Sequence, residues 1–236
     1  MPAPALLPNV PTLTRREQAY MVLASLFVTS LVITNLIAGK YFVINGLPLS
    51  CGVIVYPVTF LVTDIVSEVY GLHRARLLVM SGFVVSVSVT GLVWVAHRVP
   101  MAATSPVSAA DFGQVFGLLP GIVFGSMVAY LTAQFMDVYL FEALRKLSGG
   151  RYLWLRNNGA TLCSQLVDTV LVVTISLVLW PLYDGNAYTQ PIGYGLWRQI
   201  VVGQYLFKGL LALLDTPFVY AGVYLTRHWI GNKPCA

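Results

Sequence analysis

The sequence predicts an all-α membrane protein, a bundle of six transmembrane helices. Its 236 residues are 57% hydrophobic and only 10% charged, whereas soluble domains carry roughly 25% charged residues. A mean hydropathy of +0.76 is too high for a soluble fold of this length to bury its apolar surface. Apolar stretches of about 20 residues, the length that crosses a bilayer, recur along the chain. The lipid bilayer is therefore its expected surroundings.

Six apolar stretches can be read along the chain, over residues 18–38, 52–70, 77–96, 118–144, 159–182 and 200–225. The fourth is long enough to tilt or to project beyond the bilayer. Residues 1–17 are rich in proline and lack a long apolar core with a cleavage site, so we expect a disordered tail. Residues 18–228 are expected to form one transmembrane domain, followed by a C-terminal tail at 229–236.

The basic residues of the connections indicate the orientation, because cytoplasmic loops are enriched in Lys and Arg. One side of the predicted bundle carries ten of them: Arg15, Arg16, Arg74, Arg76, Arg145, Lys146, Arg151, Arg156, Arg227 and Lys233. The other side carries only Lys40, Arg98 and Arg198. Both termini are therefore expected in the cytoplasm.

Short motifs predict local structure between and within the spans. The Asn45-Gly46 pair between two short apolar runs predicts a small hairpin at the outer face, between the first two spans. Gly121 and Gly125 form a GxxxG pattern, which favours a close helix crossing. Pro57 and Pro217 are expected to kink their spans and to free carbonyl groups there.

Asp64 and Glu68 lie inside the apolar run VIVYPVTFLVTDIVSEVYG. Four residues apart, they share one face of a helix. A charged side chain in the bilayer costs at least about 2.5 kcal/mol, and two neighbouring carboxylates disfavour each other's ionisation. We therefore interpret the pair as part of a polar site buried among helices. The alternative is that Glu68 lies near the membrane surface, where its charge is tolerated.

Depth estimates along the helices bring other charged residues to the level of Asp64. At about 1.5 Å per residue, Asp64, Asp168 and Lys208 all fall near the middle of a bilayer core of about 30 Å. Two carboxylates and one cation at similar depth predict a charge-compensated cavity. Glu68 lies a turn closer to the cytoplasm, where it is expected to gate the exit or to pair with a basic residue.

Other polar residues extend the candidate site. Gln134 with Asp137, and Gln165 with Asp168, repeat a Gln-x-x-Asp pattern that places an amide beside a carboxylate on one helix face. Asn35 lies toward the outer end of the first span. The alternative is structural pairing, of Lys208 with Asp215 and of Asp137 with Arg145. The substrate-binding candidates are Asn35, Asp64, Glu68, Gln134, Asp137, Gln165, Asp168 and Lys208.

Several functional classes find no support in the sequence. The three cysteines are scattered without metal-ligand spacing, neither HExxH nor a Walker A loop occurs, and the basic residues follow topology, not a nucleic-acid surface. We therefore expect no catalytic residues, no metal and no cofactor, although an intramembrane enzyme using paired carboxylates stays a minor alternative. Whether two copies form a homodimer stays open.

The segment YPVTFLVTDIVSEVYGLHRAR resembles the signature of the queuosine precursor transporter family, also called the vitamin uptake transporter family. The later segments AQFMDVYLFEALRK, RNNGATLCSQLVDT and YLFKGLLALLDTPFVY are similar to its other blocks, in the same order. The resemblance covers nearly the whole chain from the first span onward. It implies a six-helix bundle with a distant likeness to the substrate-binding subunits of energy-coupling-factor vitamin transporters.

The resemblance also implies a function. The expected cargo is a 7-deazaguanine queuosine precursor, namely 7-cyano-7-deazaguanine, 7-aminomethyl-7-deazaguanine or queuine, imported across the bacterial inner membrane for tRNA queuosine modification. A carboxylate can accept two parallel hydrogen bonds from a guanine-like edge, and Phe60, Tyr205 and Phe207 are candidates to stack on the base. The alternative is a substrate-binding subunit that needs a separate ATPase module. Proton coupling and facilitated diffusion both stay open.

Overall fold

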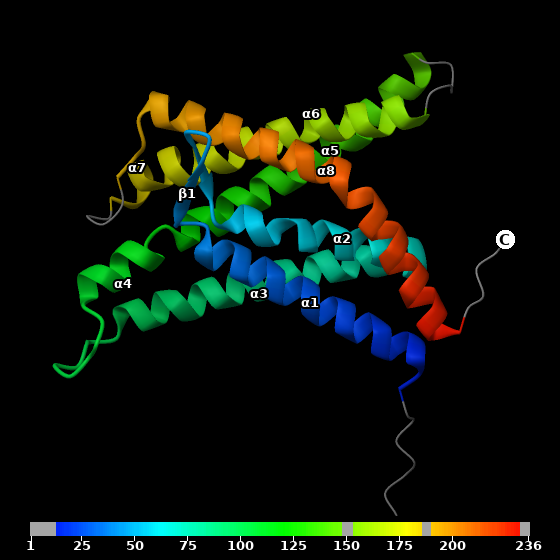
Figure 1. The fold of residues 1–236 in the computed structure, drawn as a ribbon. Helices are drawn as coiled ribbons and strands as arrows, with labels where there is room; N and C mark the ends of the chain where they lie inside the picture. Colours follow the sequence, from blue (N-terminus) through cyan, green and yellow to red (C-terminus); the bar gives the residue numbers. More distant parts are fainter. Residues whose placement is uncertain (1–12, 148–152, 186–189, 232–236) are drawn as a thin grey trace, which may run out of the picture.

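The computed structural model describes residues 13–147, 153–185 and 190–231. Within them the chain is almost entirely helical (Figure 1). The elements are α1 (Arg15–Ile37), β1 (Tyr41–Ile44), β2 (Leu47–Ser50), α2 (Gly52–Tyr70), α3 (Leu72–Arg98), α4 (Ala109–Phe116), α5 (Leu119–Leu147), α6 (Leu153–Thr174), the π-helix η1 (Ile175–Leu179), α7 (Trp180–Asp184) and α8 (Tyr194–Ile230). Each predicted span lies mainly within one of these helices or, for the fifth, within the continuous α6–η1–α7 segment.

Among the described residues, five segments are long and apolar enough to cross a membrane: Arg15–Ile37, Gly52–Tyr70, His73–Arg98, Ala109–Ala133 and Leu162–Asp184. The protein is accordingly a multi-pass membrane protein. The sixth predicted span falls within α8, which has 37 residues and is not one of the five. The sixth crossing and the orientation of the termini therefore stay predictions.

Both predicted tail boundaries differ from the helix ends. A capping box at Thr14 and Glu17, in which each side chain bonds the other residue's backbone N–H, starts α1 at Arg15. Residues 15–17 are thus helical, because the box satisfies N–H groups that a helix start leaves without partners. At the other end α8 continues to Ile230, where Gly231 closes it in the left-handed conformation. Residues 1–12 and 232–236 lie outside the described residues.

The predicted hairpin between the first two spans is confirmed. β1 and β2 pair antiparallel, from Tyr41 opposite Ser50 to Ile44 opposite Leu47. The turn needs two positive φ angles, 50° at Asn45 and 79° at Gly46, which Asn and Gly adopt most easily. The hairpin packs against α8: a side chain at Gly203 would meet Leu49 at 3.2 Å, and Leu49 itself is buried.

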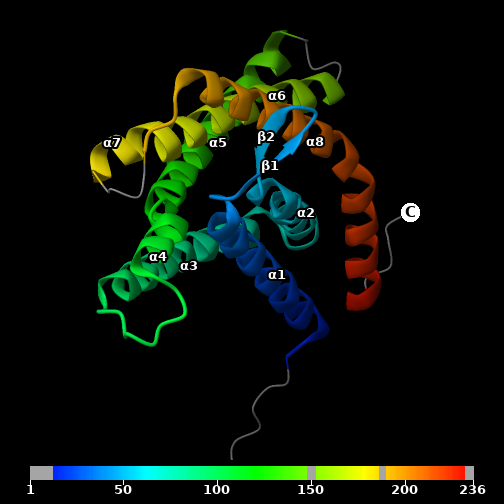
Figure 2. The ribbon, with the colours of Figure 1, turned by 60° about the vertical axis from the view of Figure 1, so that its left-hand side comes forward.

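The long helices form two groups that α8 connects (Figures 1 and 2). The first group is α1, α2 and α3, whose core contains Phe27, Val62, Val66 and Leu78. The second is α5, α6, η1 and α7. α8 packs on α6 and on α2, contains Pro217 and bends along its length in both views. It is therefore the main helix that holds the groups together.

The GxxxG pattern marks a close crossing inside the second group, as predicted. A Cβ at Gly121 would overlap the Trp180 side chain, and one at Gly125 would lie only 2.5 Å from the Ser176 hydroxyl. That hydroxyl donates a hydrogen bond of 3.1 Å to the Gly121 carbonyl. Small residues thus let α5 lie directly against the segment from η1 to α7.

Candidate functional site: a buried ion pair between three helices

An ion pair inside the bundle joins α8 to α6. Lys208 on α8 places its Nζ atom 2.9 Å from Oδ2 of Asp168 on α6. The two side chains are only 7% and 14% exposed. Removing one partner of such a pair costs about 3–5 kcal/mol, because the other charge is left uncompensated. The predicted meeting of Asp168 and Lys208 is therefore observed.

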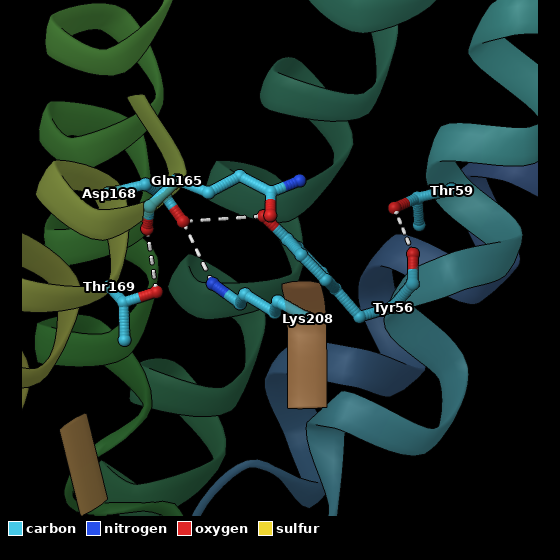
Figure 3. A network of polar contacts seen from close by, with 6 residues as sticks. All are labelled: Tyr56, Thr59, Gln165, Asp168, Thr169 and Lys208. Carbon is cyan, nitrogen blue, oxygen red and sulfur yellow. Dashed lines mark hydrogen bonds and ion pairs between the residues drawn. The ribbon is translucent and has the colours of Figure 1, made fainter. Parts of the chain in front are cut away.

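Tyr56 on α2 completes the contact (Figure 3). Its hydroxyl donates to the same Oδ2 atom of Asp168 at 3.4 Å, long for a hydroxyl donor, which usually lies at 2.5–3.0 Å. The Lys208 ammonium lies 4.6 Å from the Tyr56 ring centroid, within the range of a cation–π contact. One residue from each of α2, α6 and α8 thus meets at a single carboxylate oxygen.

Gln165 lies one helical turn before Asp168 and brings an amide to the same patch (Figure 3). Its Oε1 atom is buried and has no hydrogen-bond partner within the described part of the chain. Buried amide groups are rarely left in this state, because an unmade hydrogen bond costs about 1–3 kcal/mol. The Gln165 Oε1 atom is therefore available to accept a hydrogen bond that a bound molecule could donate.

The neighbouring threonines do not compete for such a molecule. The Thr169 hydroxyl donates to the Gln165 backbone carbonyl at 2.8 Å, and the Thr59 hydroxyl donates to the Tyr56 backbone carbonyl at 2.6 Å. Both hydroxyl protons are thus used within their own helices. The hydrogen bonds that Asp168 accepts from Lys208 and Tyr56 both go to its Oδ2 atom, and Oδ1 is a second acceptor of the same carboxylate.

Asp64, which the sequence predicts at the depth of Asp168 and Lys208, lies away from this meeting point. The α2 residue that contacts Asp168 is Tyr56, two turns or about 12 Å along the helix axis before Asp64. The depth estimate assumed that α2 begins at the outer membrane surface. Depth counted along one helix does not show how the helices are placed against one another, and here the hairpin before α2 packs against α8 at Gly203.

A ridge of four residues at i, i+4 spacing nevertheless connects Asp64 to the ion pair. It consists of Tyr56, Phe60, Asp64 and Glu68. The Tyr56 and Phe60 rings meet edge to face at 4.6 Å, Phe60, Asp64 and Glu68 are exposed, and Glu68 Oε1 binds Arg227 of α8 at 2.9 Å. The predicted pairing of Glu68 with a basic residue is thus confirmed.

The remaining predicted residues separate into two groups. Asn35 is buried and lines a cavity with residues of α3 and α5, whereas the ion pair joins α6 and α8 and contacts α2. The side chains of Gln134 and Asp137, like those of Asp215 and Arg145, lie outside the described residues. The repeated Gln-x-x-Asp pattern is therefore described only in its α6 copy.

Sequence reasoning missed Tyr56 of the site and one further buried polar residue of α8. Tyr56 stands in an apolar run of the sequence, and the signal for its polar contact is a hydroxyl beside Pro57 within a membrane span. Gln204 on α8 is 7% exposed and lies one turn before Lys208, on the same helix face. An amide four residues before a buried lysine is the corresponding signal.

Sequence comparison finds relatives that cover most of this chain. Residues 50–222 match the family model described as putative vitamin uptake transporter. A probable queuosine precursor transporter of Bacillus subtilis (strain 168) is 32% identical over 193 residues, 80% of this chain and 78% of that protein. A queuosine precursor transporter of Escherichia coli (strain K12) is 23% identical over 206 residues, covering 87% and 86%. No solved structure matches the chain.

Proposed function

This chain belongs to the putative vitamin uptake transporter family, a family of transporters and not of enzymes, and we propose that it imports 7-deazaguanine queuosine precursors. The relatives named above support this cargo class, since both names specify queuosine precursors. We further propose six crossings of the bacterial inner membrane with both termini in the cytoplasm. The ten-to-three distribution of basic residues in the connections supports that orientation.

The patch around Asp168 carries the proposal. A deazaguanine edge presents a ring N–H and an exocyclic amine side by side, with a ring carbonyl next to them. The Asp168 carboxylate can accept the two N–H groups, and the Gln165 amide, whose Oε1 atom is buried without a partner among the described residues, can bond to the carbonyl or to the amine. Which end of that amide faces the base follows from the bonds it makes. The carboxylate of Asp168 and the amide of Gln165, on one face of α6, thus match the donors and the acceptor of the deazaguanine edge.

Lys208 and Tyr56 have a different part in the proposed site. Without cargo, Lys208 compensates the Asp168 charge at 2.9 Å, and Tyr56 adds a weak bond at 3.4 Å. Cargo that binds Asp168 replaces part of these contacts, so the carboxylate keeps hydrogen-bond partners in both states. This exchange limits the cost of holding a charge in the bundle during transport.

The ridge on α2 supports a role for Asp64 and Glu68 in the passage of cargo. It begins at the ion pair with α6 and ends at the Glu68–Arg227 pair with α8. Phe60 offers a ring beside Tyr56 for stacking, and Asp64 offers a carboxylate one turn further on. We propose that a released base passes along this ridge toward the cytoplasm.

Uptake by whole cells tests the residue assignment. Cells that lack their own precursor uptake would express the wild type, Asp168→Asn, Gln165→Ala or the control Asp184→Asn, whose carboxylate is exposed at the end of α7. Initial uptake of labelled 7-cyano-7-deazaguanine is expected to fall at least tenfold in the two site variants and to stay unchanged in the control. Wild-type uptake in both site variants, at equal protein level, would contradict the assignment.

Reconstitution separates a self-sufficient carrier from a binding subunit that needs an ATPase partner. Purified protein alone in liposomes is expected to equilibrate the labelled base without ATP. Binding without transport would favour the energy-coupling-factor alternative. A protonophore added to the cells then tests proton coupling, because facilitated diffusion requires no proton gradient.

A further inference from the structure

A small cavity lies at the junction of α1, α3 and α5, where the two helix groups meet directly. Its volume is about 10 Å³. Residues of all three helices line it: Val32, Asn35 and Leu36, then Ser86, Val89 and Thr90, then Leu119 and Val123. The cavity thus lies between α5 and the first group, whereas the ion pair lies where α6 and α8 face α2.

Two buried polar side chains line this cavity without hydrogen-bond partners in the described structure. They are Asn35, through its Nδ2 atom, and Ser86, through its Oγ atom. Asn35 is 6% exposed and Ser86 only 2%. Buried polar groups are nearly always hydrogen-bonded, to protein or to ordered water. The two groups therefore need a partner that the surrounding side chains do not provide.

The chemistry of the lining limits what this partner can be. Five of the eight lining residues are aliphatic. Thr90 already donates its hydroxyl proton to the Ser86 carbonyl at 2.9 Å, so its oxygen can only accept. Asn35 Nδ2 is a donor, and Ser86 Oγ can donate or accept. A partner must both accept and donate within a very small volume.

We propose that a single water molecule binds in this cavity and bridges Asn35 and Ser86. A volume of about 10–15 Å³ is what one buried water requires, together with two to four polar partners. The water accepts a bond from Asn35 Nδ2 and donates to Ser86 Oγ, with Thr90 Oγ1 as a further acceptor. It links α1 to α3 directly beneath α5 and satisfies Asn35 without any cargo.

The sign of a stability change tests this site. With water bound, Ser86→Ala removes one of its anchors and leaves Asn35 Nδ2 weakly paired, so Tm of the purified protein is expected to fall by about 2–4 °C. In a dry cavity the same substitution removes an unsatisfied hydroxyl, and Tm would rise or stay constant. Ser88→Ala is the control, because that exposed hydroxyl bonds within its own helix at 2.8 Å, and no change is expected.

A structure determined at a resolution that shows ordered solvent provides the second measurement, on the unaltered protein. The expected result is one density peak within hydrogen-bond distance of Asn35 Nδ2 and Ser86 Oγ. The absence of that peak, or a direct bond between the two side chains, would overturn the proposal. A Tm that rises with sodium but not with choline would identify a bound cation instead and would overturn it equally.

Discussion

The ion pair between Asp168 and Lys208 makes the strongest prediction about stability. Replacing Asp168 by Asn leaves the Lys208 ammonium, 7% exposed, without a countercharge. An unpaired buried charge costs about 3–5 kcal/mol. For a chain of this length 1 kcal/mol shifts Tm by about 2–4 °C, so Tm is expected to fall by about 6–20 °C. Lys208→Met is expected to lower Tm by a similar amount, because it leaves the Asp168 carboxylate without a countercharge.

The double variant distinguishes pairing from other causes of instability. Asp168→Leu combined with Lys208→Met replaces both charges by apolar groups, which is often neutral or stabilising. Its Tm is therefore expected to lie close to that of the wild type and above both single variants. Uptake of the base is expected to stay lost, because no carboxylate remains to bind it.

Thermal unfolding of the purified protein in detergent, with uptake measured on the same variants in cells, provides both readouts. A double variant as unstable as the weaker single variant would refute the reasoning, since the cost would then not come from an unpaired charge. Recovery of uptake in the double variant would refute the assignment of Asp168 to cargo while leaving the stability argument intact.

Three further predictions concern other parts of the molecule. The Cβ of Gly121→Ala would overlap Trp180, so this variant is expected to lower the free energy of unfolding by about 1–3 kcal/mol. Gly91 has open space around it, so Gly91→Ala is expected to leave that free energy unchanged. The Tm values of both variants check this. Burial raises the pKa of Tyr41 from 10.0 to about 12. The unfolded chain therefore loses this proton first as the pH rises. The free energy of unfolding is expected to be constant below pH 10 and to fall by about 3 kcal/mol between pH 10 and 12. Tyr41→Phe should flatten that part of the profile of Tm against pH, and an unchanged slope would count against the burial of the phenol. The side chains of Glu68 and Arg227 are 62% and 35% exposed. Glu68→Gln should therefore change the free energy of unfolding by less than about 1 kcal/mol. A larger loss measured by denaturation would mean that this pair is shielded from water.

The sequence determined the features that depend on local patterns. Apolar stretches of membrane length predicted the helices, because each must satisfy its own backbone hydrogen bonds. The Asn45-Gly46 turn predicted the hairpin, since few other residues adopt two consecutive positive φ angles. Gly121 and Gly125 predicted a close crossing. Asp168 and Lys208 were recognised because charge inside an apolar helix is costly unless it is compensated.

Only the tertiary structure decided which polar groups meet. Depth along a helix can be counted from the sequence, but the starting point of each helix depends on how its connections pack. The hairpin packs against α8, and the α2 side chain that bonds Asp168 is that of Tyr56. The lateral arrangement likewise placed Asn35 in a separate cavity with α3 and α5. Contacts between distant segments depend on packing geometry, which no local pattern in the chain encodes.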